Sequence, residues 1–251
     1  MELNKIISPV LAIFKYSTRK ILFNRRWVIT LLIALLVGVI MGYAGSQLDD
    51  ALNDGTTLMD VLILSFIMPI ITMIYGTSLI RNEIEDRSIT QVITAPLDRR
   101  IAYLGYYFSL AAALSLIMLV INLVGWVSFF AQQGMDGDSL TILGSMCLVS
   151  VIGALAYSAL FLASGVFLKK PVYFGLFYAF IWESFIGSIP GAISHYTIKH
   201  FVRSIASGWL EWGSIGIYDG TSVGASIAVL AGVTIAFLVL GAMMFKESEY
   251  P

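Results

Sequence analysis

The sequence has little charge and a single cysteine. Only 12% of its 251 residues are charged and 58% are hydrophobic, whereas a soluble domain carries about 25% charged residues. These charges are too few to cover a water-soluble globule. Much of the apolar surface must therefore face lipid. The single cysteine, Cys147, excludes an intramolecular disulfide and any cysteine-based metal cluster. The net charge of -1 argues against nucleic acid as a partner.

The chain also lacks a phosphate-binding loop of the form G-x-x-x-x-G-K-[ST], and none of its seven lysines follows a glycine. We therefore expect no nucleotide hydrolysis by this chain. A metal site is not expected either. The two histidines, His195 and His200, are five residues apart, which does not favour one helical face, and no third ligand is evident. They are interpreted as a solvated pair at the membrane interface, and no bound cofactor is predicted.

Long apolar runs are what the chain does have. About 20 apolar residues in a helix cross the hydrocarbon core of a bilayer. Six runs reach about this length: 27–47, 58–80, 101–131, 139–168, 171–188 and 221–245. The predicted fold is therefore an all-α membrane protein with six transmembrane helices, in a single transmembrane domain over residues 1–251. The basic start before the first run is too long for a cleavable signal, so this run is expected to be retained.

The basic residues are unevenly distributed between the predicted loops. With the N-terminus inside, 13 of the 15 Lys and Arg residues fall in inner segments, and only Lys199 and Arg203 fall outside. The first two outer loops carry aspartates and no basic residue. By the positive-inside rule, both ends of the chain are predicted to be cytoplasmic.

Two further segments are predicted to be helical without spanning the membrane. Residues 3–24 place apolar and basic residues on opposite faces at helical spacing, which predicts an amphipathic helix on the inner leaflet. Residues 189–219 predict a short outer-face helix that could re-enter the membrane, followed by a stretch rich in glycine and tryptophan. In this helix, His195, Lys199 and Arg203 recur every four residues.

The inner loop over residues 81–100 is more elaborate than a simple connection. A charged cluster is followed by apolar residues near helical spacing, and a proline ends this short predicted helix. Such a helix with both signs of charge suits a docking surface for another protein. The candidate docking residues are Glu83, Glu85, Asp86, Arg87, Ser88, Ile89, Pro96 and Arg99.

This loop resembles the signature of ABC-2 type permeases, the membrane subunits of a class of ATP-driven exporters. In that family an acidic residue follows the second span, then come a Gly-Thr-like step, an apolar helix, and Pro-x-x-Arg shortly before a Gly-Lys pair. Two positions depart from the pattern: Arg87 replaces a frequent glycine and Tyr106 a frequent lysine. The matching positions are Glu83, Glu85, Ser88, Pro96, Arg99 and Gly105.

The resemblance implies a non-catalytic permease subunit in the plasma membrane of a prokaryote. It implies pairing with a second permease copy, identical or paralogous, and a separate cytoplasmic ATPase that binds ATP and Mg and docks on residues 81–100. It does not indicate a substrate. An ion-coupled secondary transporter is the alternative, which predicts buried ionisable residues in broken helices, and only Glu183 is a candidate. An intramembrane hydrolase is disfavoured, because both histidines lie in the predicted outer segment.

Polar and small residues within the spans allow two interpretations each. A carboxylate at membrane depth costs about 2.5–3.5 kcal/mol, so Glu183 either faces a pathway or partner, or reaches the outer interface. Asn122 either binds substrate or ties helices together. Gly38 and Gly42 form a face on which helices approach closely, and packing within the chain is favoured over a dimer contact.

Overall fold

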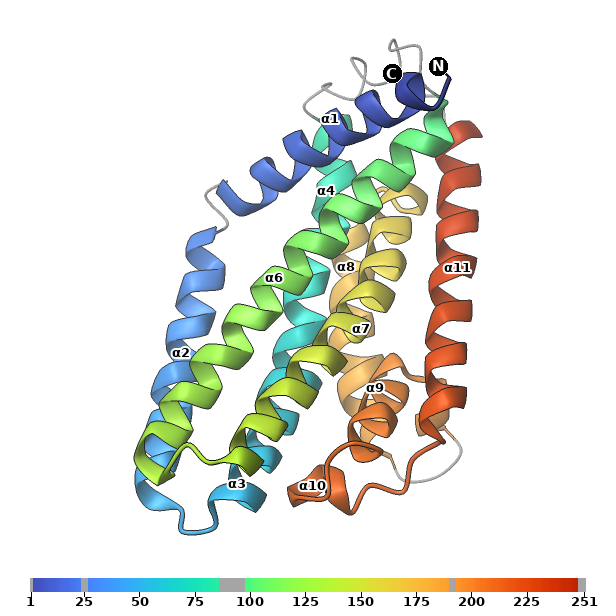
Figure 1. Ribbon diagram of the computed structural model, residues 1–251. Helices are drawn as coiled ribbons and strands as arrows, with labels where there is room; N and C mark the ends of the chain where they lie inside the picture. The colour runs from blue at the N-terminus through green and yellow to red at the C-terminus, as the bar shows by residue number, and fades with distance from the viewer. Residues whose placement is uncertain (1, 24–26, 86–97, 190–192, 248–251) are drawn as a thin grey trace.

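The computed structural model describes residues 2–23, 27–85, 98–189 and 193–247, and every regular element within these ranges is a helix (Figure 1). Long helices run side by side along one direction. Helix α1 crosses one end of this bundle, and α3, α9 and α10 lie at the opposite end (Figure 1). The predicted all-α fold is confirmed.

The long helices account for most of the chain. Five stretches are long and apolar enough to cross a membrane: Trp27–Gln47, Ala51–Glu83, Arg99–Gln133, Gly137–Phe167 and Val223–Glu247. The α-helices are α1 (Glu2–Phe23), α2 (Trp27–Gln47), α3 (Ala51–Leu58), α4 (Met68–Glu85), α6 (Arg99–Gln133), α7 (Gly137–Phe167), α8 (Pro171–Leu176), α9 (Ile198–Ser207), α10 (Gly213–Gly216) and α11 (Val223–Glu247). Two π-helical segments, η1 (Met59–Ile67) and η2 (Phe177–Phe185), and two short 3-10 turns, η3 (Ile186–Ser188) and η4 (Ser194–Tyr196), complete the described elements.

Hydropathy predicted most of these bounds closely, with two differences. The second span begins at Ala51 rather than at residue 58, because α3, η1 and α4 follow one another without a break. The Asp50 side chain starts this helix by accepting a hydrogen bond from the Asn53 backbone N–H at 3.2 Å. The predicted span 171–188 is helical throughout, but it is divided among α8, η2 and η3 and is not among the five spans. A sixth span stays a prediction.

The π-helical segment η1 has a local cause in the sequence. It ends at Ile67, two residues before Pro69 in the first turn of α4. Proline has no N–H for the helical hydrogen bond, and its ring collides with the carbonyl four residues earlier. Wider turns just before a proline relieve this collision, and such turns recur at functional sites.

Helices α6 and α7 form the centre of the bundle and carry its largest sets of buried side chains. Glycines set the closest approaches to them. A Cβ atom on Gly76 of α4 would lie 2.6 Å from the Cβ of Phe161 in α7, so only glycine fits there. Gly38 and Gly42 of α2 face Ser128 of α6, so this small-residue face is used for packing within the chain, as expected.

Helix α1 has the extent predicted for residues 3–24 and packs against α6. Ile21 is buried, and Ile13 and Leu22 pack against the core. Lys15 and Arg19 are exposed. The described side chains thus separate into an apolar and a basic side, while the position of α1 on a leaflet stays a prediction.

Candidate functional site

A first polar cluster lies where α1 meets the end of α4. The Glu83 side chain is only 1% exposed, and its Oε1 accepts a hydrogen bond from Lys20 Nζ of α1 at 2.7 Å. Lys20 Nζ also lies 5.8 Å from the centre of the Tyr16 ring. An ion pair removed from water in this way fixes the two helices relative to each other, because either charge alone would be costly to bury.

Much of the predicted docking loop lies outside the described residues. Asp86, Arg87, Ser88, Ile89 and Pro96 belong to this part, and Glu85 is described only as the last residue of α4, without its side chain. The predicted amphipathic helix between α4 and α6 therefore stays a prediction.

Asp98 immediately precedes α6. The Asp98 carboxylate accepts a hydrogen bond from the Arg100 backbone N–H at 2.9 Å, which caps the helix. The Arg99 guanidinium donates to the carbonyl oxygen of Lys246 at 3.3 Å. This contact joins the start of α6 to the end of α11, at the same end of the bundle as α1 (Figure 1).

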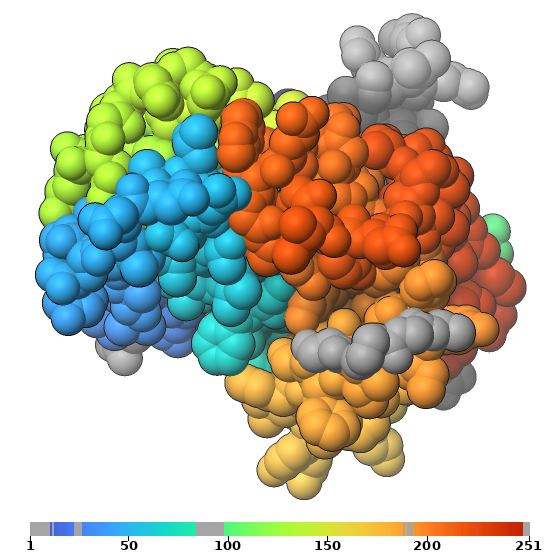
Figure 2. Space-filling view, turned by 90° about the horizontal axis from the view of Figure 1, so that it is seen from below, coloured from blue at the N-terminus to red at the C-terminus, as the bar shows by residue number. Residues whose placement is uncertain are grey.

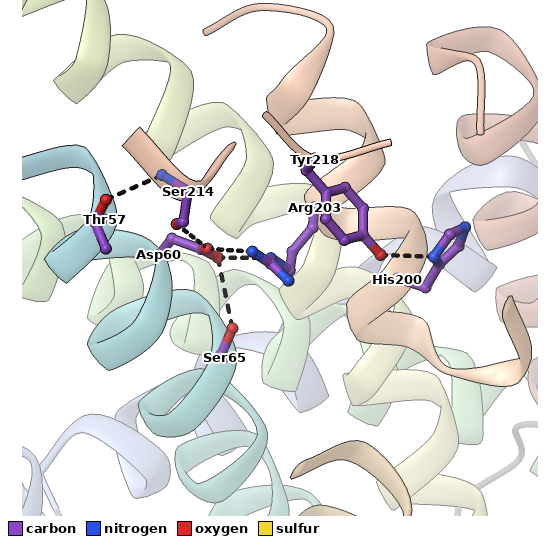
Figure 3. Close-up of polar contacts among 7 residues, drawn as sticks. All are labelled: Thr57, Asp60, Ser65, His200, Arg203, Ser214 and Tyr218. Carbon is purple, nitrogen blue, oxygen red and sulfur yellow. Dashed lines mark hydrogen bonds and ion pairs between the residues drawn. The ribbon is translucent and has the colours of Figure 1, made fainter. Parts of the chain in front are cut away.

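A second polar cluster lies at the opposite end, where Asp60 of η1 meets Arg203 of α9 (Figure 3). Arg203 Nε donates to Asp60 Oδ1 at 3.1 Å and its second nitrogen donates to Oδ2 at 2.7 Å, so the pair is bidentate. The hydroxyl of Ser214 donates to Oδ2 at 2.7 Å, and that of Ser65 reaches Oδ1 at 3.5 Å. The Asp60 side chain is 0% exposed, so these donors replace the water it has lost.

Aromatic and polar groups extend this cluster along α9. The Arg203 guanidinium lies 4.3 Å from the centre of the Tyr218 ring, and the Tyr218 hydroxyl is 2.7 Å from His200 Nδ1 (Figure 3). His200 Nε2 is 3.0 Å from the Thr221 hydroxyl, and the His195 ring stacks on His200 at 4.2 Å. Burial first, then the nearby charges of His195 and Arg203, lower the pKa of His200 below its usual 6.5. The imidazole is therefore neutral at pH 7.

The expectation of a solvated histidine pair is thus wrong for His200, which is only 2% exposed. The helical conformation is interrupted between η4 and α9 at Thr197, which is extended. This interruption lets the rings of His195 and His200, five residues apart, stack on each other. Lys199 is buried too, and this burial lowers its pKa. Lys199 and His200 of α9 therefore both lie against the protein.

Glu183 holds the other end of α9. Its carboxylate oxygens accept the backbone N–H groups of Ile198 and Lys199, each at 3.0 Å, and the side chain is 0% exposed. The first N–H groups of a helix have no partner within it and attract negative charge. The Thr197 hydroxyl accepts the next one, from His200, at 3.2 Å. Glu183 therefore faces a partner within the chain, and a role in a pathway stays a prediction.

The two buried carboxylates share a structural context. Asp60 lies in η1 and Glu183 in η2, and both bind α9, one through Arg203 and the other through the helix amino end. We call Asp60, Glu183 and their contacts to α9 the α9 clamp. Nearby, Gly213 and Ser214 donate backbone hydrogen bonds to Asn53 and Thr57 of α3. Figure 2 shows the orange segment that contains α9 and α10 beside the blue α3, covering this end of the bundle.

Asn122 lies between α6 and α7, away from both clusters. Its side-chain amide donates to the Met118 carbonyl and to the Ser150 hydroxyl, each at 2.9 Å, and it is fully buried. It ties the two central helices together, and its contact with a substrate stays a prediction.

Sequence reasoning did not identify Asp60 and Arg203 as a site. The signal was present, because Asp60 is an acid in a predicted span and Arg203 is one of only two basic residues assigned to the outer side. Ionisable residues in spans usually have a partner or a function. Pairing two residues 143 positions apart requires the topology, which the sequence pattern does not contain.

The helices and the two polar clusters together define a multi-pass membrane protein in which one continuous helical run, α3 to α4, carries the acid of each ion pair, Asp60 and Glu83. Residues 14–185 match the model of a family described as ABC-2 family transporter protein. This match covers more than half of the chain, from α1 through η2, so the chain belongs to the ABC-2 transporter family. The match includes Asp60, Glu83 and Glu183 and ends before α9. No curated protein matches the chain.

Proposed function

We propose that this chain is the permease subunit of an ABC exporter. Two copies, identical or paralogous, would form the translocation path, and a separate cytoplasmic ATPase would dock on the loop that follows α4. The chain itself would be non-catalytic, and ATP and Mg would bind to the partner. The family match supports the permease assignment, and the substrate is left open.

One observation carries the coupling part of the proposal: a continuous helix joins the two polar clusters. Glu83 and Asp60 lie on the same run from Ala51 to Glu85. At about 1.5 Å per residue they are about 35 Å apart along the helix, enough to cross a hydrocarbon core of about 30 Å. A displacement of the docking loop would therefore reach the α9 clamp directly. A rigid-body shift of this kind is a common form of switching between two states.

The proposal places the α1 end of the bundle in the cytoplasm of a prokaryotic cell. The described residues at this end include Lys15, Arg19, Arg81, Arg100 and Lys170, whereas the α9 end holds Lys199 and Arg203. This distribution follows the positive-inside rule. In this orientation α9 covers the outer end, and the α9 clamp holds it closed in the resting state.

The clamp also favours a permease over an ion-coupled carrier. A secondary transporter needs a buried group that is free to take up and release its coupling ion. Among the described residues, the buried carboxylates are Asp60, Glu83 and Glu183. Asp60 is held by Arg203, Glu83 by Lys20, and Glu183 by the amino end of α9. All three groups are engaged in holding helices together.

Co-purification tests the proposal. The tagged chain is isolated from its source membranes, bound proteins are identified by mass spectrometry, and ATP hydrolysis by the complex is measured with and without vanadate. We expect an ATPase with a phosphate-binding loop to co-purify and to be lost with Ile89→Asp. The matched control Ile189→Asp places the same charge at the α9 end and should retain the ATPase. If the ATPase still co-purifies with the Ile89→Asp variant, docking occurs elsewhere. Solute transport by the purified chain alone would overturn the permease assignment.

A further inference from the structure

A groove of about 500 Å³ runs between α6 and α11 at the α1 end of the bundle. It has one charged residue and an otherwise apolar wall. The lining residues are Arg100, Leu104, Leu238, Val239, Ala242 and Met243.

The groove adjoins a close contact between the two helices. Tyr103 packs directly onto Gly241, and its ring centre lies 5.8 Å from that of Phe245. This contact draws the helices together at one side of their crossing. Arg100 and Leu104 are four residues apart and share one side of α6, next to Tyr103. The groove lies alongside this tight contact, where Arg100 and Leu104 line it together with residues of α11.

The groove wall is almost wholly apolar, and charged residues lie where the two helices end. Arg100 lies in the first turn of α6, and Lys246 lies in the last turn of α11, so the charged end of the groove is at the helix ends. Leu238 is eight residues before Lys246, which places it about 12 Å deeper at about 1.5 Å per residue. A charged head and an apolar chain would thus meet matching surfaces in the right order.

The charge at this end favours an anion. Among the described residues at these two helix ends, Arg99, Arg100 and Lys246 carry positive charge, against Asp98 and Glu247. The Asp98 carboxylate is engaged with the Arg100 backbone N–H. Among the residues that the structure describes, no carboxylate pairs with the Arg100 guanidinium. A guanidinium at a membrane boundary binds phosphate through charge-assisted hydrogen bonds.

We propose that this groove is a binding site for one anionic phospholipid, with its phosphate on Arg100 and an acyl chain along Leu104, Leu238 and Met243. Val239 and Met243 are about half exposed, at 53% and 46%, so a lipid reaches the groove sideways from the bilayer. The site lies directly after the predicted docking loop. The bound lipid would therefore stabilise the start of α6, where motion of the loop enters the bundle.

Lipid binding to the purified full chain tests this inference. Phosphatidylglycerol or phosphatidylcholine is titrated into detergent micelles, and bound lipid is counted by native mass spectrometry alongside the thermal unfolding midpoint. We expect phosphatidylglycerol to bind and to raise the midpoint, and phosphatidylcholine to do neither. Arg100→Gln should weaken phosphatidylglycerol binding roughly ten-fold, as expected for the loss of one charge-assisted contact.

Two further variants separate the charge from the groove. Ala242→Trp fills the apolar wall while keeping Arg100 and should also abolish phosphatidylglycerol binding. Lys169→Gln removes an exposed positive charge elsewhere at this end and should bind as the unaltered chain does. The inference is overturned if Arg100→Gln binds phosphatidylglycerol normally, or if Ala242→Trp does. It is equally overturned if Ala242→Trp weakens self-association while lipid binding is unchanged, because the groove would then be an interface between copies.

Discussion

Breaking the Asp60–Arg203 ion pair should destabilise the protein by an amount that the structure bounds. Asp60→Asn keeps the shape of the side chain but leaves the Arg203 guanidinium without its counter-charge. Removing one partner of a fully buried pair costs about 3–5 kcal/mol. The Arg203 side chain is 19% exposed and keeps its stacking on Tyr218, so we expect about 2–4 kcal/mol for Asp60→Asn.

Removing the charge of Arg203 instead should lower the free energy of unfolding by more. Arg203→Gln leaves the Asp60 carboxylate at 0% exposure, with only the Ser214 and Ser65 hydroxyls donating to it. We expect about 3–5 kcal/mol, since a buried charge without a counter-ion keeps most of its desolvation cost. The double variant removes both charges and should be less destabilised than the sum of the two single changes, by roughly 2 kcal/mol.

The free energy of unfolding in mixed micelles, measured for the four members of this cycle, provides the test. Asp138→Asn serves as the control, because it makes the same change at an exposed acid in the first turn of α7 and should stay within about 0.5 kcal/mol. Additive effects of the two single substitutions, within about 0.5 kcal/mol, would refute the reasoning, because they would mean that the two side chains do not interact.

Substitutions at three further residues test other contacts. Glu183→Ala leaves two buried N–H groups of α9 unpaired and should lower the free energy of unfolding by about 1–3 kcal/mol for each. Glu183→Gln keeps an acceptor and should cost less, and equal unfolding free energies of the two variants would contradict the capping role. Burial lowers the pKa of His200, so its contribution to stability is complete above pH 6.5 and is lost as the pH falls through the folded-state pKa. The thermal unfolding midpoint should therefore decrease as the pH is lowered from 6.5, and His200→Gln should flatten this dependence. Lys20→Gln should cost about 1–3 kcal/mol, less than Arg203→Gln, because Lys20 is 27% exposed; an unchanged unfolding free energy would show that its pair with Glu83 contributes nothing.

The sequence predicted the helical class and most of the spans because lipid imposes a length and a composition that can be read directly. The predicted runs 27–47 and 221–245 agree with α2 and α11 within two residues. The early start of the second span was missed because Asn53, Asp54 and the neighbouring threonines interrupt the apolar run. Asn53 and Thr57 are paired with the Asp50 cap and with α10, contacts that hydropathy does not include.

The α9 clamp could not be predicted for a different reason. Its two carboxylates lie in π-helical segments, where the wider turn changes which residues face the protein, and a regular helical periodicity does not describe this. Glu183 was recognised as unusual, but its partners are backbone N–H groups 15 and 16 residues away. The docking residues from Asp86 to Pro96 rest on the charge and apolar spacing of the loop and on its resemblance to the family pattern, and they stay a prediction.

The close contact between Gly76 and Phe161 has a mechanical consequence. If η1 and α4 tilt together as one rigid rod about this tight point, the arm to Glu83 spans seven residues and the arm to Asp60 spans sixteen, or about 10 Å and 24 Å. A push of about 1 Å at the short arm then becomes more than 2 Å at the long one, which is enough to part a hydrogen bond. Because Gly76 has no side chain, α4 pivots close to α7 at this point. A small displacement near Glu83 at one membrane surface would then break the Asp60–Arg203 ion pair at the other.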